Sequence, residues 1–566
     1  MSTITNNEEG NKVLFWGCFI ALVTTAFAFI SRMFLLGTWG AEFGLDDAQA
    51  GRLMGIGIWP FAVSIIGFSL IIDRIGYKVA MYFAFVSHIA WAVLAISAFF
   101  ISQNGDKDLA FKLIYWGSLI CALGNGTVEA FINPVVATMY NKEKTKWLNI
   151  LHAGWPGGLV IAGMITIFID SVPWWIKVGM IVIPAVVYFM MLVKCKFPEN
   201  ERVVSGVSYK EMLGEFGVLG AAIVGFLVTL QLIDFASQGG AEVVSSQKTM
   251  FIAIGVAIAA GFGFYTKSLG RPLLFILVLI HMPLAVTEIG TDGWIESILK
   301  GVAENKFHAG WVLVYTSAIM MILRFYAGPI VKKLQPIRLL ALSSLLAIIG
   351  LYTLSITTGM AIFLAATIYG LGKTFLWPTM LGVVSEQCPR GGAVALNAIS
   401  GIGMLAVGTL GFPYIGALKE AKSIESVQAN AAIVETVPGL VKNGEFQAKD
   451  QKKIYEIIKY SAFSDVKVDD LIKELPDKEK EEIKDKIKVA KGVSGQKALA
   501  DMTYFPLFML ICYLGLLFHF KSKGGYKPVM LGGGGDLSEG DDGDEPADSN
   551  EEDSNGEDSN EESKDN

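Results

Sequence analysis

Residues 69–78 read Ser-Leu-Ile-Ile-Asp-Arg-Ile-Gly-Tyr-Lys, a short charged loop between two long apolar runs. The run before it covers about residues 52–72, and the run after it covers about residues 77–101. Each is long enough to cross a bilayer as a helix, since a span needs about 20 apolar residues whose backbone polar groups bond within the segment. The charges between the two runs therefore predict a tight connection at one membrane surface.

The same pattern of apolar runs and short polar loops extends along the chain in both directions. Of the 566 residues, 53% are hydrophobic and only 17% are charged, which places the protein in a bilayer rather than among soluble domains. We expect spans at about residues 13–37, 52–72, 77–101, 111–139, 147–170, 173–195, 214–235, 249–267, 272–298, 309–331, 338–357, 359–385, 391–418 and 503–520. The predicted fold class is an all-α membrane protein with about 14 transmembrane helices.

The distribution of charge over the short loops predicts the orientation of the chain. Lys and Arg in such loops stay preferentially on the cytoplasmic side. They cluster after the even-numbered spans, whereas the first loop carries Glu42, Asp46 and Asp47. We therefore predict a multi-pass protein of the cell (inner) membrane with both termini in the cytoplasm.

Six spans, a joining region and six more spans predict two halves with insertions. The expected parts are an N-terminal six-helix half at 1–195, a linker with two extra transmembrane helices at 196–270, the first five helices of a C-terminal half at 271–418, an extracytoplasmic insert at 419–502, the last helix at 503–520 and an acidic cytoplasmic tail at 521–566.

The insert and the tail differ from the rest of the chain in composition. Apolar residues recur at helical spacing at Ile454, Ile457 and Ile458, and again over 471–475, which predicts a small helical insert. The tail has too few apolar residues to form a core, so we expect it to be disordered.

The loop at 69–78 resembles the cytoplasmic loop signature of the major facilitator superfamily, G-x-x-x-D-R-x-G-x-R/K, with Ser69 in place of the first glycine. Other stretches resemble the fucose, galactose and glucose proton symporters of that superfamily: 43–45 with 48–51, Glu129 with 133–134, 148–149, 324–325 with Gly328 and Pro336, 288–294, and 377–379. The resemblance implies the major facilitator fold, in which two six-helix halves rock about a central site.

Three positions depart from that symporter branch. Arg32 replaces an Asn-Asp pair that is usual in the first helix, His152 replaces a residue that is often Gln, and Lys373 replaces a common Asn. The two inserted helices and the insert are also unusual for the branch. The superfamily is thus better defined by the sequence than the sugar specificity.

The resemblance implies secondary active transport of a small polar solute by alternating access, coupled to protons and acting on a sugar or a sugar-like substrate. Two alternatives remain open: a transporter of an organic anion, sugar acid or drug, and a transporter-like membrane sensor that binds without flux. We expect no enzymatic activity, cofactor, metal or nucleic acid, since no catalytic cluster and no phosphate-binding loop is visible in the sequence. The expected partners are the solute, protons and the lipid bilayer, and the chain is expected to be a monomer.

Ionisable groups within a span are the strongest candidates for function, because each costs on the order of 3 kcal/mol or more to insert. Glu129 resembles the proton-carrying carboxylate of the family and is the predicted proton-coupling residue. The other interpretation is a fixed pair between Glu129 and Arg32 or Lys373. These two cations either bind an anionic group of the solute or pair with carboxylates, which include Glu288 and Asp292.

Two sets of residues complete the predicted site. The predicted substrate-binding residues are Arg32, Asn133, Asn149, His152, Glu288, Asp292, Trp294, Lys373 and Trp377. The predicted gating residues are Asp73, Arg74, Gly76, Lys78, Arg324 and Gly328, and Arg324 is placed near the cytoplasmic end of its helix.

Overall fold

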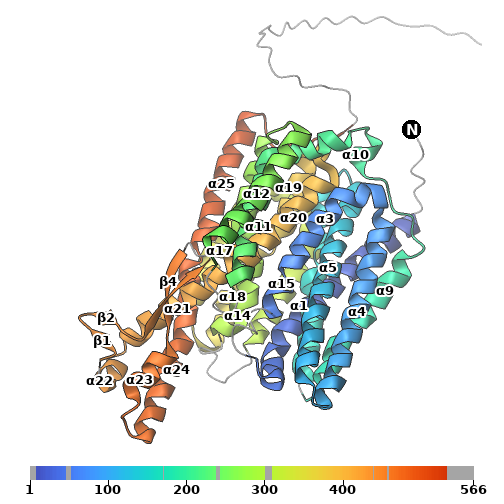
Figure 1. Ribbon diagram of the computed structural model, residues 1–566. Coiled ribbons are helices and arrows are strands. Elements are labelled where there is room, and N and C mark those ends of the chain that lie inside the picture. The colour runs from blue at the N-terminus through green and yellow to red at the C-terminus, as the bar shows by residue number, and fades with distance from the viewer. Residues whose placement is uncertain are drawn as a thin grey trace, which may run out of the picture. The chain divides into compact units, whose positions relative to one another are not determined.

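The computed structural model describes residues 8–45, 53–169, 171–237, 243–299, 309–437, 439–454 and 458–531. Predictions about Asp46, Asp47, Ile457 and the acidic tail from residue 532 onward lie outside the described residues. The described chain is a bundle of long helices (Figure 1). Thirteen of them, or fourteen with a bent pair counted as one span, are long and apolar enough to cross a membrane.

The N-terminal half contains six spans, two of which are divided by short breaks. Its helices are α1 (Glu8–Phe43), α3 (Trp59–Ile75), α4 (Tyr77–Gln103), α5 (Lys107–Met139), α6 (Lys144–Leu151) with α7 (Gly154–Phe168), and α8 (Trp174–Gly179) with α9 (Val182–Leu192). Each break precedes a proline, Pro156 in α7 and Pro184 in α9. Since proline has no backbone N–H, the helix cannot continue its hydrogen bonds without interruption there.

The linker adds a short helix and a helical hairpin. These are α10 (Glu201–Val204), α11 (Tyr209–Ser237) and α12 (Ser245–Thr266). Helix α11 packs against α12 and against the C-terminal half, whereas α12 leaves most of its surface exposed. An exposed apolar helix of this length is suited to contact with lipid.

The C-terminal half also contains six spans, several of them divided. Its elements are α13 (Pro272–Ala285), η1 (Val286–Gly290) and α14 (Thr291–Leu299); α15 (Gly310–Phe325) and α16 (Ala327–Leu334); α17 (Pro336–Ile356); η2 (Gly359–Ala361), α18 (Ile362–Lys373) and α19 (Leu376–Gln387); η3 (Pro389–Gly391), α20 (Gly392–Ala406), η4 (Val407–Gly411) and α21 (Phe412–Gln428); and α25 (Tyr504–Ser522). Both η1 and η4 are single π-helical turns. Helices α15 and α16 meet at a bend of 70°.

The two halves pack closely through α3 against α20, α7 against α15 and α6 against α19. Small residues make this possible, because they allow membrane helices to approach each other. A Cβ added to Gly401 of α20 would lie 2.5 Å from the Ile66 side chain of α3, and one added to Gly163 of α7 would lie 2.9 Å from Val314 of α15. The two interfaces therefore depend on the absence of a side chain at these glycines.

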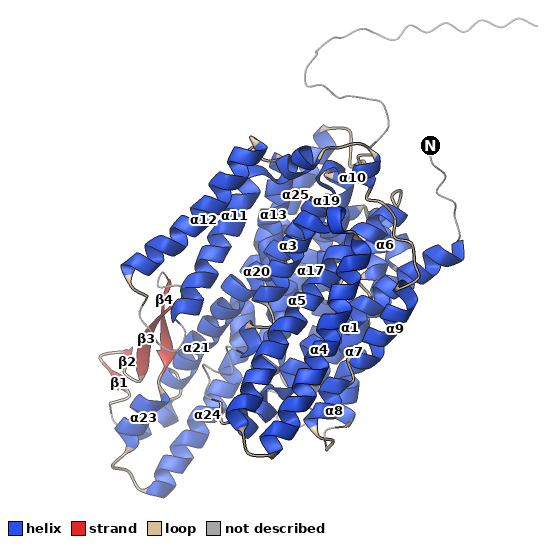
Figure 2. Ribbon diagram, turned by 45° about the vertical axis from the view of Figure 1, so that its right-hand side comes forward, coloured by secondary structure: helices blue, strands red, loops and turns tan. Residues whose placement is uncertain are grey.

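The insert contains strands as well as helices (Figure 2), whereas the sequence predicts a small helical insert. It comprises α22 (Ala431–Thr436), β1 (Val441–Lys442), β2 (Glu445–Phe446), β3 (Lys449–Ile454), β4 (Ile458–Phe463), α23 (Asp465–Ile472) and α24 (Asp477–Asp501). Two antiparallel hairpins form, β1–β2 and β3–β4, and in the second Ile454 is paired with Ile458.

The helix predicted over Ile454–Ile458 is therefore wrong, and of the stretch predicted over 471–475 only residues 471 and 472 are helical, at the end of α23. Tertiary packing decides the difference. Ile454 lies in an apolar cluster with Leu230 and Ile233 of α11 and Phe251 of α12, so a hairpin buries it against the linker helices. Spacing alone could not show this contact.

The insert is attached to the C-terminal half through two long helices. Helix α21 extends the span of α20 and η4, and α24 leads directly into α25 (Figure 1). Helix α24 also contacts α14 and α17, where the side-chain amide of Gln496 donates to the Leu354 carbonyl at 2.5 Å. We call this end of the bundle the insert end. The opposite end, which carries the loops at 193–208, 267–271 and 388–391, is called the basic end.

Candidate functional site

A small cavity lies between the two halves near the middle of the bundle. It is lined by Phe61, Glu129, His152 and Trp155 of the N-terminal half and by Glu288, Ile289, Arg324, Trp377 and Met404 of the C-terminal half. Its volume is about 20 Å³, close to what a single water molecule requires. Glu129 is 5% exposed and Arg324 is 1% exposed. This is a closed state, which has to open before a larger solute can enter.

Arg324 makes three hydrogen bonds at this cavity, and one of them connects the two halves. Its Nε donates to the Thr374 carbonyl at 2.6 Å, and one terminal nitrogen donates to Glu288 Oε1 at 2.7 Å. The other terminal nitrogen donates to the His152 carbonyl of the N-terminal half at 2.9 Å. One guanidinium thus joins the α18–α19 break, η1 and the α6–α7 break.

Two prolines explain why these carbonyls are available to Arg324. In an α-helix, a carbonyl accepts from the N–H four residues later. Pro156 follows His152 by four residues and Pro378 follows Thr374 by four, and proline has no N–H to donate. Each break therefore leaves one backbone carbonyl without its helical partner, and Arg324 donates to both carbonyls.

The sequence prediction placed Arg324 near the cytoplasmic helix end as a gating residue. The structure has Arg324 in the last turn of α15, and its side chain is 1% exposed and lines the central cavity. The paired prolines beside two helix breaks are the signal in the sequence that could have indicated this position.

Glu288 is held by an irregular stretch of its own helix. Pro283 in α13 is followed by the π-helical turn η1, which carries Glu288 into the cavity. Such turns occur frequently at functional sites. Oε1 accepts from Arg324, and Oε2 accepts from the backbone N–H of Trp377 at 3.0 Å. Both carboxylate oxygens of Glu288 are therefore bound.

Glu129 differs from Glu288 because, in the described chain, no cation forms an ion pair with it. Its Oε2 accepts from the side-chain amide of Asn133 at 2.7 Å, and Asn133 Oδ1 lies 2.9 Å from His152 Nε2. Within the ranges that the structure describes, no Lys or Arg nitrogen lies at ion-pair distance from Glu129. A buried carboxylate without a cation is costly to keep charged. Of the cavity carboxylates, Glu129 is therefore the one suited to exchange its charge.

Lys373 and Asp292 form a buried ion pair in the C-terminal half. The ammonium of Lys373, at the end of α18, donates to Asp292 of α14 and lies 5.3 Å from the centre of the Tyr369 ring. Neither residue lines the cavity. The interpretation that pairs Lys373 with Glu129 is wrong, because Asp292 compensates the cation within the same half.

Arg32 also lies away from the cavity and away from Glu129. Its guanidinium donates to the Gly57 carbonyl at 3.2 Å and covers the face of that glycine, where an added Cβ would lie 1.8 Å from a guanidinium nitrogen. This contact connects α1 to the segment before α3 within the N-terminal half. The alternative pairing of Arg32 with Glu129 is thereby also excluded.

Two other predicted binding residues do not line the cavity. Asn149 donates to Thr379 Oγ1 at 3.2 Å, at the contact between α6 and α19. The Trp294 ring lies 5.5 Å from the ammonium of Lys419, toward the insert. The cavity thus brings together Glu129, His152, Glu288 and Trp377 of the predicted set, and Asn133 lies directly behind them.

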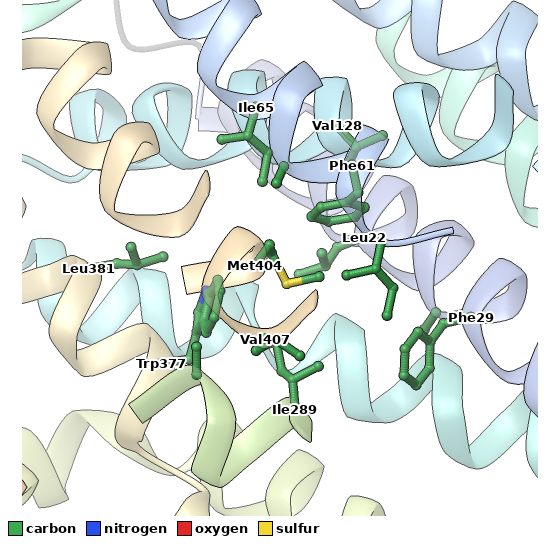
Figure 3. Close-up of a cluster of buried hydrophobic side chains, with 14 of the residues drawn as sticks. Leu22, Phe29, Phe61, Ile65, Val128, Ile289, Trp377, Leu381, Met404 and Val407 are labelled. Carbon is green, nitrogen blue, oxygen red and sulfur yellow. The ribbon is translucent and has the colours of Figure 1, made fainter. Parts of the chain in front are cut away.

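The remaining wall of the cavity is apolar. Figure 3 shows Phe61 of α3 opposite Met404 of α20, with Trp377 and Ile289 alongside. The sequence analysis did not single out Phe61, Ile289 or Met404. Single apolar residues within apolar helices carry no signal that separates a site from the lipid-facing surface.

The loop signature forms part of the basic end. Asp73 pairs with Arg202 at 2.7 Å, and the Arg74 guanidinium lies 4.5 Å from the centre of the Tyr209 ring. Gly76 joins α3 to α4 with a φ of 83°, a left-handed conformation that glycine adopts without strain, and Lys78 follows in the first turn of α4. Three of the predicted gating residues therefore contact the linker or shape the turn.

A second group of contacts at the basic end joins α6 to α19. Glu386 Oε1 accepts from the Thr145 N–H at 3.0 Å and from the Thr145 hydroxyl at 2.5 Å. Lys144 pairs with Glu201 at 2.5 Å and donates to the Ser385 carbonyl at 3.3 Å. We call the Thr145–Glu386 contact the α6–α19 latch.

The chain after α25 also binds this region. The Tyr526 hydroxyl donates to Glu386 Oε2 at 2.7 Å, and the N–H of Val529 donates to the Glu386 carbonyl at 2.8 Å. The sequence predicts residues 523–531 as the beginning of the acidic tail. In the structure they form a segment that packs on α19. Gly328 of α16 lies nearby against α6, since its added Cβ would be 3.3 Å from the Lys146 side chain.

Two six-helix halves around a buried polar cavity define a transport protein of the membrane. Residues 14–413 match the sequence model of the Major Facilitator Superfamily, and the chain belongs to this superfamily. This confirms the predicted superfamily, its helical membrane fold and a transporter rather than an enzyme.

Two solved structures of transporters share the fold, and a third is a weaker match. The proton:xylose symporter XylE bound to 6-bromo-6-deoxy-D-glucose is 14% identical, with a TM-score of 0.51 over 72% of this chain and 89% of that chain. The human organic anion transporter MFSD10 is 10% identical, with a TM-score of 0.52 over 89% and 99%. The E. coli fucose:proton symporter FucP is 14% identical, with a TM-score of 0.46 over 87% and 98%. A comparison with curated proteins found no match.

Proposed function

We propose that this transporter couples the movement of a small, neutral, polar solute to protons, and that Glu129 is the residue that binds the coupled proton. The observation that carries the proposal is the difference between the carboxylates. Glu288 and Asp292 are each paired with a cation, whereas Glu129 is bound to the neutral amide of Asn133. A proton that neutralises Glu129 removes the cost of a buried charge.

The position of Glu129 supports coupling between proton and solute. It lines the same cavity as Arg324, which bridges the halves through the His152 carbonyl. His152 also contacts Asn133, the partner of Glu129. A change in the charge of Glu129 can therefore affect the hydrogen bond between Arg324 and the His152 carbonyl through the contacts from Glu129 to Asn133 and from Asn133 to His152. Both termini are proposed to lie in the cytoplasm of a cell whose inner membrane holds the protein.

The composition of the cavity supports a neutral solute with hydroxyl groups, such as a sugar. Trp155 and Trp377 offer aromatic faces, and Glu129 and His152 offer polar groups. Aromatic rings with nearby hydrogen-bonding groups suit ligands that have both an apolar face and a polar edge. An anionic solute is less well supported, because Arg324 and Lys373 are compensated by carboxylates.

Transport into proteoliposomes tests the proposal. We would measure uptake of a labelled panel of neutral sugars and sugar acids, with and without an inward proton gradient. We expect gradient-driven accumulation of a neutral sugar in the unaltered protein. In Glu129→Gln, the solute concentration inside should rise only to the concentration outside. Exchange of labelled for unlabelled solute should continue, because the cavity is otherwise intact.

The matched control is Asp108→Asn, which removes an exposed carboxylate from the same helix and should leave accumulation unchanged. Full accumulation in Glu129→Gln would contradict the assignment of the proton site. Accumulation of sugar acids alone would favour the organic anion alternative. Binding of a solute without flux in either direction would favour the sensor.

A further inference from the structure

A surface cavity that is wide and open lies at the basic end, away from the central site. It has a volume of about 570 Å³ and lies between α11, the link from α12 to α13, and η3. It is lined by Lys210, Glu211, Gly214, Glu215, Thr266, Ser268, Gly270, Arg271 and Arg390. The linker hairpin, which lies outside the two six-helix halves, thus provides most of its wall.

The charges of this cavity favour an anion. Three cations line it, and within the described chain Lys210 and Arg390 have no carboxylate at ion-pair distance. The third, Arg271, lies 3.4 Å from Glu215. The other carboxylate, Glu211, accepts from the backbone N–H of Ser208 at 2.8 Å at the start of α11. Two cations therefore remain available for a ligand.

The backbone fixes the shape of the cavity. Helix α11 bends at Gly217, whose φ is 59°, and the link turns at Gly270, whose φ is 102°. A Cβ on Gly217 would lie 2.1 Å from the backbone nitrogen of Gly270, so the two chains cross at a distance that only glycine permits. The N–H groups of Val218 and Leu219 donate to the carbonyls of Ser268 and Leu269, both at 3.0 Å. The wall is thus held by hydrogen bonds before any ligand binds.

The ends of two candidate membrane spans place the cavity at the level expected for lipid headgroups. The span of α11 begins at Tyr209, next to Lys210 of the cavity. The span of α12 ends at Thr266, which lines the cavity itself. The neighbouring side chains of Phe264 and Leu269 are 85% and 71% exposed, as expected for groups that contact lipid chains. A phospholipid could therefore place its phosphate in the cavity and its chains along α12.

We propose that this cavity binds the phosphate of an anionic phospholipid of the surrounding bilayer. Lys210 and Arg390 contact the phosphate, and the Gly217–Gly270 crossing forms the wall behind it. Bound lipid connects the linker hairpin to η3, and so to the C-terminal half. The inference concerns a site separate from the central cavity and does not depend on proton coupling.

Native mass spectrometry of the purified full chain tests this site. The probe is phosphatidylglycerol, added to delipidated protein in detergent, and the readout is the fraction of protein that retains one lipid. The variant Lys210→Gln/Arg390→Gln should bind roughly 25-fold more weakly, since each basic side chain near an anionic lipid contributes about fivefold. The control Lys332→Gln/Lys333→Gln removes two exposed cations from α16 at the same end and should bind as the unaltered protein does.

A parallel titration with inorganic phosphate distinguishes the source of the anion. Protection of the protein from thermal unfolding by phosphatidylglycerol, and not by phosphate, supports a lipid site. Equal protection by phosphate would overturn the lipid assignment in favour of a soluble anion. Equal loss of lipid in both double variants would overturn the site itself, because binding would then follow overall charge.

Discussion

The α6–α19 latch allows a quantitative prediction for the opening of the basic end. Glu386 belongs to the C-terminal half and Thr145 to the N-terminal half, so both of their hydrogen bonds must break when the halves separate there. Hydrogen bonds to a charged group contribute about 1.5–3 kcal/mol, and those between neutral groups about 0.5–1.5 kcal/mol. Glu386→Gln should therefore weaken the latch by about 2 kcal/mol, roughly 30-fold in the ratio of open to closed states.

A native cysteine provides the assay. Cys388 is buried and lines a small cavity between the halves together with Lys144 and Pro134. In a background in which the other cysteines are serine, the rate of Cys388 modification by N-ethylmaleimide reports how often the basic end opens. We expect this rate to rise by at least tenfold in Glu386→Gln.

A series at Thr145 provides the internal controls. Thr145→Val keeps the backbone N–H but loses the hydroxyl bond to the Glu386 carboxylate, which contributes about 1.5–3 kcal/mol, so it should raise the rate by at least about tenfold. Thr145→Ser retains both donors and should label at the rate of the unaltered protein. An unchanged rate in Glu386→Gln, with an unchanged melting temperature, would refute the role of this contact in holding the basic end closed.

Two further changes test buried contacts. Asp292→Asn leaves Lys373 without its carboxylate and should lower the free energy of unfolding by about 3–5 kcal/mol, seen as a fall of several degrees in Tm. The double variant Asp292→Leu/Lys373→Met should recover most of this loss, and similar Tm values for the two variants would contradict the pairing. Gly57→Ala places a methyl group on the Arg32 guanidinium and should lower Tm, while Gly67→Ala meets nothing within 4 Å and should not; equal Tm values would show that the Arg32 contact is dispensable.

The fold could be predicted to a large extent, because span length and loop charge follow from the physics of the bilayer. A helix in lipid must satisfy its own backbone, so an apolar run of sufficient length has few alternatives. The insert has no such constraint. Ile454 and Ile458 form a strand pair because the linker helices provide an apolar surface for the hairpin, and that surface is about 200 residues away in the sequence.

The site could be predicted only in part. Glu129, His152, Glu288 and Trp377 stood out as polar or aromatic groups within spans, and they line one cavity. Arg32 and Lys373 stood out for the same reason, yet they lie elsewhere. A charged residue within a span indicates that an opposite charge or a hydrogen-bond partner lies near it. Whether a neighbouring helix or a solute provides that partner depends on tertiary contacts.

Helix α24 is continuous with the last span, α25, so the insert should move together with the C-terminal half. The 25 residues of α24 correspond to about 37 Å. If the C-terminal half turns by on the order of 15°, an angle known for rotating subunits, the tip would sweep an arc of roughly 10 Å. A motion that is small around the central cavity would therefore be magnified at the far end of the insert, where a fluorescent pair could follow each cycle without touching the transport path.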